Sequence, residues 1–266
     1  GKCSSSMYRT PYATQDGLLV LERHVSESLL DESPRSPEDV RAFQKIVGSL
    51  LYCATNTRCD IAYAVAMLCR CMSRPTPDLF KDARHVLGYL EKTKSLGLTY
   101  ARNDKELYGF SDSDWATKHS TSGFVFMFNS AAISYGSLKQ TSVALSSCEA
   151  EIMAASEAAK EGKFLSGFLA ELDEQLSSPL EIGVDNQAAR DLAYNPEHHK
   201  RTKHIDRRHF YVRELVENHT IRVPFVRTAD NLADLFTKSL NPRTFLALRN
   251  IIMNVPLHTG GAPSAE

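Results

Sequence analysis

Hydrophobic residues recur at helical spacing in the first third of the chain. Between residues 40 and 51 they fall on one face of a helix, and Ser36-Pro37 in front of them supplies an N-cap hydroxyl and a proline at the first helical position. Two further apolar stretches predict helices that begin at Asp60 and at Thr76. The three helices together predict a small helical module over residues 36–100.

The period of the hydrophobic pattern changes after residue 106. Short runs of apolar, aromatic and β-branched residues predict strands there. Ser146 and Glu149, three positions apart, form a capping box that predicts the start of a long helix, and a final helix is predicted to begin in residues 231–238. The predicted strands cover residues 107–112, 124–128, 133–135, 180–185 and 221–226. This order of elements predicts an α/β layer fold over residues 104–240.

The two ends of the chain carry weaker patterns. Residues 1–35 have no sustained period and many Ser, Asp and Glu, so we expect an extended lead-in. Residues 241–266 are expected to form a C-terminal helix followed by a disordered tail, because Gly260-Gly261 and Pro263 lie in the last stretch. The chain has no starting Met, and we expect a piece of a longer protein or the scar of a tag.

Composition narrows the class of protein. Of the 266 residues, 42% are apolar and 24% are charged, which is ordinary for a globular protein with a buried core. The 31 basic and 32 acidic side chains nearly cancel, so only a local basic patch could bind nucleic acid. No apolar run reaches the ~18 residues that span a membrane, and no secretion signal is found. The six cysteines lack CxxC spacing and favour a reducing compartment with buried thiols.

Three acidic residues stand where an open α/β sheet places its site. Asp112 and Asp185 end predicted strands, and Glu151 lies in the first turns of the long helix. If these elements converge, three like charges meet and require a cation. Carboxylate oxygens favour Mg²⁺ or Mn²⁺, and two ions roughly 4 Å apart suit phosphodiester cleavage. By spacing alone, an aspartate at the end of a strand is more often a turn former.

Short motifs follow one another along the second half of the chain. In order they are Gly109-Phe110-Ser111-Asp112-Ser113-Asp114-Trp115-Ala116, Ser120-Thr121-Ser122-Gly123, Lys139-Gln140-Thr141, Glu149-Ala150-Glu151, Asp185-Asn186-Gln187-Ala188-Ala189, Arg201-Thr202-Lys203-His204-Ile205-Asp206 and Asn231-Leu232-Ala233-Asp234. This string closely resembles the ribonuclease H domain at the C-terminal end of the Pol polyprotein of Copia-type LTR retrotransposons, over residues 107–240. A second set resembles the helical segment that trails the reverse transcriptase palm in that polyprotein: Val47-Gly48-Ser49-Leu50-Leu51-Tyr52, Asp60-Ile61 and Leu87-Gly88-Tyr89-Leu90.

The resemblance implies a fold, an activity and partners. The fold would be ribonuclease H-like, a five-stranded mixed sheet flanked by helices, preceded by a helical connection or thumb-like segment of a reverse transcriptase. The activity would be endonucleolytic hydrolysis of the RNA strand of an RNA–DNA hybrid with two Mg²⁺ or Mn²⁺ ions. The partners would be the hybrid and the polymerase region of the same polyprotein. The protein would work without a membrane, in a cytoplasmic retrotransposon particle or in the nucleus.

The resemblance also assigns roles to four acids as catalytic residues and metal ligands. Asp112 would bridge both ions, and Glu151 would hold the second ion. Asp185 would be the acid after the fourth strand, and Asp234 the fourth acid, near the C-terminus.

Two neighbouring acids are expected to lie outside the site. Asp114 lies in Ser113-Asp114-Trp115-Ala116, a stretch without β-branched residues, so the chain is predicted to leave the sheet after Asp112 and to turn Asp114 away. If the strand continued past Asp112, Asp114 would point the same way as Asp112 and could reach a metal. Glu149 already has a role in the capping box, and it faces about 200° away from Glu151 around the helix.

Three positions depart from the family pattern and keep rival functions open. Tyr135, Cys148 and Ile152 stand where tryptophan, threonine and tyrosine are usual. They allow a degenerate or domesticated remnant that binds nucleic acid or protein without cutting. A second rival is an appendage that grips template–primer for a polymerase, since the paired-aspartate turn of a polymerase is absent from these residues. An integrase is disfavoured, because the glutamate here comes between the two aspartates.

A basic stretch over residues 198–213 is the candidate for contact with nucleic acid. Six basic side chains stand there against Asp206 alone, a local charge of +5 that can neutralise phosphates. The alternative is an ordinary solvated helix face. Trp115, the single tryptophan, is expected to be a core anchor. The proposed contact residues are Lys200, Arg201, Lys203, Arg207 and Arg208. A weaker alternative, a zinc site, rests on His198, His199, His204 and His209.

Overall fold

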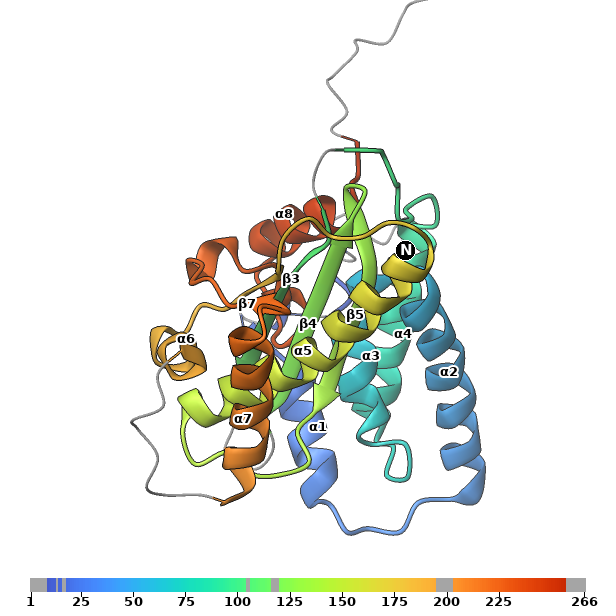
Figure 1. Cartoon of the computed structure of the whole chain (residues 1–266). Helices are drawn as coiled ribbons and strands as arrows, with labels where there is room; N and C mark the ends of the chain where they lie inside the picture. The colour runs from blue at the N-terminus through green and yellow to red at the C-terminus, as the bar shows by residue number, and fades with distance from the viewer. Residues whose placement is uncertain are drawn as a thin grey trace, which may run out of the picture.

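A five-stranded mixed sheet forms the centre of the molecule (Figure 1). The computed structural model describes residues 9–12, 14–15, 18–103, 106–115, 120–194 and 203–256. The strands of the sheet are β3 (Tyr108–Asp114), β4 (Thr121–Phe128), β5 (Ala131–Lys139), β6 (Leu180–Gly183) and β7 (Ile221–Arg222). Their order across the sheet is β5-β4-β3-β6-β7. Neighbouring strands among β3, β4 and β5 pair antiparallel, whereas β6 is parallel to β3 and β7 to β6, which confirms the predicted ribonuclease H-like sheet.

Helices cover both faces of this sheet. Helices α5 (Ser147–Glu171) and α7 (Lys203–Glu217) lie across one face, and Figure 1 draws them in front of the strands. The helical module packs against the other face and consists of α2 (Pro37–Asn56), α3 (Ala62–Cys69) and α4 (Pro77–Lys92). The remaining elements are β1 (Thr14–Gln15), β2 (Leu18–Leu19), α1 (Leu21–Leu30), η1 (Cys59–Ile61), α6 (Gln187–Tyr194), η3 (Thr228–Asp230), η4 (Leu232–Phe236) and α8 (Pro242–Ile252). Among the described residues, no helix has the length and apolar character to span a membrane.

Strand β4, which lies beside the central strand β3, links two hydrophobic cores. Successive side chains of a strand point to opposite faces, and β4 is buried on both. Phe126 belongs to the core beneath α5 and α7. Val125 and Met127 belong to the core that the helical module shares with η4 and α8. The helical module is therefore packed onto the sheet through a common core. The division of the chain at residues 100–104 stays a prediction.

Side-chain caps set the starts of the longest helices. Ser36 accepts a hydrogen bond from the backbone N–H of Asp39 at 3.0 Å, and Thr76 accepts one from that of Leu79 at 3.3 Å. Ser146 likewise caps α5 through the N–H of Glu149. These caps satisfy N–H groups that the first helical turn leaves without a partner. The predicted starts at Ser36, Thr76 and Ser146 are confirmed.

The prediction that Asp60 caps a helix is wrong. Asp60 lies inside η1, buried, and its two carboxylate oxygens accept hydrogen bonds from Arg58 at 2.9 and 2.8 Å. The hydroxyl of Tyr89 donates to the same carboxylate at 2.6 Å. The side chain thus forms a buried ion pair with Arg58 and a hydrogen bond to α4, and α3 begins at Ala62 without a side-chain cap. A buried aspartate needs such partners, and they outcompete the role of a cap.

The lead-in is not extended throughout, as was predicted, because residues 21–30 form α1. Leu21, Val25 and Ser28 are buried on one face of this helix, and His24 Nδ1 lies 2.8 Å from Asp82 Oδ2 of α4. The buried face of α1 has only two apolar residues, Leu21 and Val25, and its third buried residue is a serine. Leu30, at the end of the helix, is 68% exposed. That short stripe explains why the period was missed.

The C-terminal part also departs from the prediction. No α-helix begins in residues 231–238, which contain the short 3-10 helix η4. The C-terminal helix expected in residues 241–266 is α8, which begins at Pro242 with Asn241 as N-cap. The predicted fifth strand is cut short, since Pro224 lacks an N–H for the ladder and only a bridge joins Val184 to Phe225. The predicted tail over residues 257–266 lies outside the described residues.

Candidate metal centre

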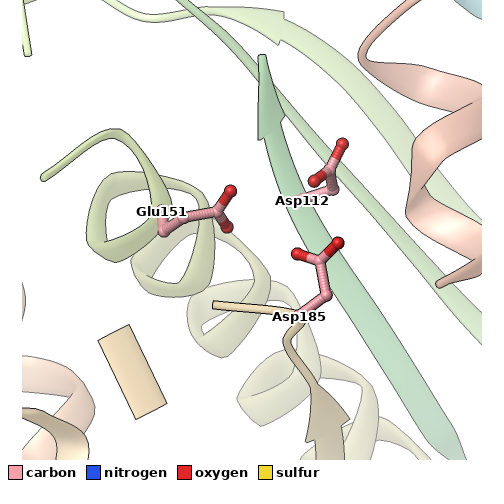
Figure 2. Close-up of side chains that lie close together, drawn as sticks. All are labelled: Asp112, Glu151 and Asp185. Atoms are coloured by element: carbon pink, nitrogen blue, oxygen red, sulfur yellow. The ribbon is translucent and has the colours of Figure 1, made fainter. Parts of the chain in front are cut away.

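Three carboxylates meet at the carboxyl ends of the two central parallel strands. β3 and β6 run side by side with Phe110 opposite Gly183, so the strand continuations bring Asp112 and Asp185 close together. Glu151 reaches the same point from the second turn of α5. One ligand oxygen from each residue lies within 4.8 Å of the others. Figure 2 shows the three side chains directed toward a shared space.

Glu151 is held in place by the strand next to it. Its Oε1 accepts hydrogen bonds from the backbone N–H of Ser113 at 3.3 Å and from the Ser113 hydroxyl at 2.9 Å. Its Oε2 is buried and has no hydrogen-bond partner among the described residues. Burial, and then the charges of Asp112 and Asp185, raise the pKa of Glu151 to about 8. A cation beside these carboxylates is therefore needed before all three groups can stay ionised at neutral pH.

Asp112 is buried and is contacted from the segment that follows η4. The Thr237 hydroxyl donates a hydrogen bond to its Oδ2, and the Nζ of Lys238 lies 3.6 Å from the same oxygen. These contacts orient the carboxylate and partly neutralise it.

The fourth acid, Asp234, lies outside this group of three but beside Asp112. It is buried in η4, and its Oδ1 forms a 2.8 Å ion pair with Nζ of Lys238. Burial, and then the charge of Asp112, raise the pKa of Asp234 to about 7, although Lys238 lowers it. Lys238 was not singled out in the sequence, and its spacing of four residues after Asp234 was the available signal. The structure thus places an ammonium between Asp112 and Asp234.

The two acids expected outside the group of three do lie outside it. The reason given for Asp114 was wrong, however, because β3 continues to this residue, which pairs with Thr121. Burial raises the pKa of Asp114, and the charge of Lys238 opposes that change. The carboxylate of Glu149 accepts a hydrogen bond from the backbone N–H of Leu145 at 2.6 Å. The predicted capping box would instead have the N–H of Ser146, the next residue, as the donor.

The three unusual residues have packing roles. Tyr135 stacks on Phe236 with ring centroids 5.8 Å apart. Ile152 is buried and lines a small apolar cavity beside Val184. Cys148 is half-buried in the first turn of α5, and burial raises the pKa of its thiol.

Trp115 is not the core anchor that was predicted. It is 54% exposed, and its Nε1 donates a hydrogen bond to the carbonyl of Ala144 at 3.2 Å. It directly follows the last residue of β3, where the chain leaves the sheet. Trp115 therefore exposes its indole two residues after Ser113, the residue that holds Glu151.

The basic stretch is only partly described. Lys200 and Arg201 lie outside the described residues, as do His198 and His199, and Lys203 begins α7. Arg207 is exposed, and Nη1 of Arg208 donates to the Ser142 hydroxyl at 3.5 Å. His209 is buried, with Nε2 2.6 Å from the carbonyl of Leu192. Among the described residues, Asp112, Glu151 and Asp185 form the sole candidate metal group. The zinc alternative therefore has no support among these residues.

The sequence relatives of the chain are mobile-element polyproteins. The retrovirus-related Pol polyprotein from transposon TNT 1-94 of Nicotiana tabacum is 36% identical over 214 residues, 79% of this chain. The corresponding polyprotein from transposon RE2 of Arabidopsis thaliana is 37% identical over 230 residues, 84% of this chain. The chain belongs to the Copia-type Pol polyproteins. This Pol segment spans 16% of the length of each of these two relatives. No family model matches it.

Solved structures give more distant likenesses. LC11-RNase H1 in complex with an RNA/DNA hybrid is 10% identical, covers 50% of the Pol segment and 94% of its own chain, and has a TM-score of 0.39. The foamy viral protease-reverse transcriptase in complex with an RNA/DNA hybrid is 14% identical and has a TM-score of 0.46. This match covers 86% of the Pol segment and 29% of the viral chain. The assignment of the fold rests on the strand order β5-β4-β3-β6-β7 and not on these two structures.

The raised pKa of Glu151 predicts how the stability of the metal-free Pol segment depends on pH. The folded protein keeps a proton on Glu151 up to about pH 8, whereas the ordinary value is 4.5. The resulting stability is fully present below pH 4.5 and is lost as pH rises through 8. In EDTA, Tm should therefore fall by roughly 5 °C between pH 5.5 and pH 8.5. Differential scanning fluorimetry measures this.

Glu151→Gln is the matched variant for this prediction, because it keeps the shape and removes the titration. Asp234 contributes in the same direction, since its pKa is also raised. The variant should therefore show a smaller fall in Tm over this range, and not a flat profile. An identical fall in both proteins would show that Glu151 is not the titrating group.

Proposed function

We propose that this Pol segment is a ribonuclease H, an endonuclease that hydrolyses the RNA strand of an RNA–DNA hybrid with two Mg²⁺ or Mn²⁺ ions. The observation that carries the proposal is the convergence of the buried Asp112 and Glu151 with the half-buried Asp185, in a chain that belongs to the Copia-type Pol polyproteins. As part of such a polyprotein it works with the polymerase region of the same polyprotein, in a cytoplasmic retrotransposon particle.

The residues present fit a divalent metal ion. All three ligands are carboxylates, the hard oxygen donors that Mg²⁺ and Mn²⁺ prefer. Glu151 directs an unpartnered buried oxygen into the group, and an uncompensated buried carboxylate is costly without a cation. In this proposal Asp112, Glu151 and Asp185 hold the ion that the resemblance counts as the second, and Asp112 with Asp234 hold the other. We name the ion at the three converging acids the first ion, and the ion beside Asp234 the second ion.

The bound ions supply the activation of water and the stabilisation of charge on the scissile phosphate. The protein contributes the geometry. Ser113 fixes Glu151 through two hydrogen bonds, and Thr237 fixes one oxygen of Asp112. Buried surroundings exclude bulk water, so these groups need little reorganisation when charge develops.

A path for the hybrid follows from contacts around the loop before α5. Trp115 contacts Ala144, and Arg208 contacts Ser142 in the same loop. Val143 and Leu145 of this loop are exposed. An exposed indole and a guanidinium therefore contact the loop that leads into α5, the helix that carries Glu151, and in this proposal the sugars and phosphates of the hybrid lie along this loop. Recognition by shape and 2′-hydroxyl contacts gives little sequence preference.

The basic stretch should govern the salt dependence of hybrid binding. Replacing Lys200, Arg201 and Lys203 with alanine should weaken binding and flatten the slope of log affinity against log salt by about one unit per lost phosphate contact. The emission of Trp115, the single tryptophan, reports binding in EDTA without cleavage. The matched control replaces three exposed lysines elsewhere, Lys45, Lys160 and Lys163. Equal slopes in the two triple variants would show that the basic stretch makes no specific contact with phosphates and is an ordinary solvated helix face.

The test of activity is a cleavage assay on a hybrid with labelled RNA and DNA strands. In Mg²⁺ the RNA strand should be cut internally while the DNA strand stays whole, and EDTA should stop the reaction. The rival function is a degenerate or domesticated remnant, favoured by Tyr135, Cys148 and Ile152. Binding of the hybrid without cleavage in either Mg²⁺ or Mn²⁺ would establish that rival.

A further inference from the structure

A lysine occupies one side of the metal centre. Nζ of Lys238 lies 2.8 Å from Oδ1 of Asp234 and 3.6 Å from Oδ2 of Asp112. The ammonium thus sits between the two acids that the proposed function assigns to the second ion. The group of Asp112, Glu151 and Asp185 converges without Asp234. One side of the centre is therefore a cluster of three carboxylates, and the other already holds an ammonium.

The backbone around Lys238 is fixed from a distant part of the chain. The N–H of Ser239 donates to Oε1 of Glu22 at 3.2 Å, and the N–H of Leu240 donates to the hydroxyl of Tyr12 at 2.6 Å. Thr237, on the other side, binds Asp112 through its hydroxyl. The position of Lys238 beside the acids is therefore built into the fold.

The side chain itself can leave. It is 36% exposed, whereas the side chain of Asp112 is 3% exposed and that of Asp234 is 10% exposed. A lysine has a long flexible stem, so its ammonium can swing into solvent while its backbone stays in place.

We propose that Lys238 is an internal counter-cation that occupies the Asp112–Asp234 side of the centre, so that the two divalent ions bind in a fixed order. The first ion binds to Asp112, Glu151 and Asp185. The second ion binds beside Asp234 only when the ammonium withdraws. This inference rests on the proposed function, because it assumes a divalent ion at the three acids. It adds that the free protein holds one ion tightly and the second weakly.

The experiment titrates Mn²⁺ into the protein without nucleic acid, and electron paramagnetic resonance counts the free ion. Wild type should bind one ion tightly and a second one weakly. Lys238→Met keeps the length and removes the charge, so affinity for the second ion should rise about tenfold or more, because a cation no longer repels it at short range. Affinity for the first ion should change much less. Lys238→Arg keeps the charge and should behave like wild type.

Two further variants separate the possible failures. Asp234→Asn in the Lys238→Met background should remove the gained ion, and Glu151→Gln should weaken the first one. Unchanged affinity for the second ion in Lys238→Met, with a tight first ion that depends on Glu151, would overturn the role of Lys238 and leave the metal centre standing. If wild type binds no Mn²⁺ at the three acids, the metal centre of the proposed function fails, and the role of Lys238 fails with it.

Discussion

Replacing Asp112 with asparagine should lower hybrid cleavage by about a thousandfold or more. The reason is that Asp112 belongs to the converging group and faces Lys238 and Thr237 as well, so the substitution removes a charge that both sides of the centre use. Glu151→Gln should have an effect of the same order, because it removes the ligand with the unpartnered oxygen. Single-turnover cleavage in Mg²⁺ measures both losses, with circular dichroism as the check on folding.

Glu149→Gln is the matched control for this prediction. It changes the same kind of side chain on the same helix, two residues from Glu151, but Glu149 contacts only the N-terminal end of α5. Its cost is limited to about 1 kcal/mol of capping energy, so cleavage should stay near the wild-type rate. Near-normal cleavage by Asp112→Asn, or a loss in Glu149→Gln as large as in Glu151→Gln, would contradict the assignment of the acids.

Asp60→Ala should destabilise the fold by about 3–5 kcal/mol. Arg58 would keep its charge in a buried position after losing two hydrogen bonds to the carboxylate. The hydroxyl of Tyr89 would lose its acceptor as well, and Arg249 contacts that same hydroxyl at 3.3 Å. Urea unfolding, followed by circular dichroism, gives the free energy of unfolding.

The control for this prediction is an exposed ion pair. Asp78→Ala breaks the pair with Lys81, whose atoms are 2.8 Å apart on the surface of α4. Solvent screens such pairs, so the loss should be a small fraction of the loss for Asp60→Ala. Equal effects of the two substitutions would mean that burial of the Arg58–Asp60 pair is not what makes it important.

Local signals in the sequence predicted the parts of the fold that local interactions determine. Ser36, Thr76 and Ser146 cap helices through hydrogen bonds to residues three positions away, and a pattern can show such contacts. Asp60 was misread because an aspartate that caps a helix and one in a buried ion pair look alike in sequence. Its partner Tyr89 lies 29 residues away, which no local pattern reveals.

The candidate site divides in the same way. Asp112, Glu151 and Asp185 were found because strand ends, a helix start and the motif order point to the same acids. Lys238 was missed, since a lysine after a short apolar stretch resembles a surface residue until its contact with Asp112 is known. Trp115 was misplaced because a lone tryptophan is usually buried, and here the strand ends just before it.

The hydrogen bonds from Ser239 to Glu22 and from Leu240 to Tyr12 make the folding unit larger than the catalytic motif. A fragment limited to residues 104–240 would contain all four acids but neither Glu22 nor Tyr12. It would also expose the face of β4 that Val125 and Met127 share with the helical module. A cut between the helical module and the acids should therefore leave the four acids without the segment that holds the backbone beside them.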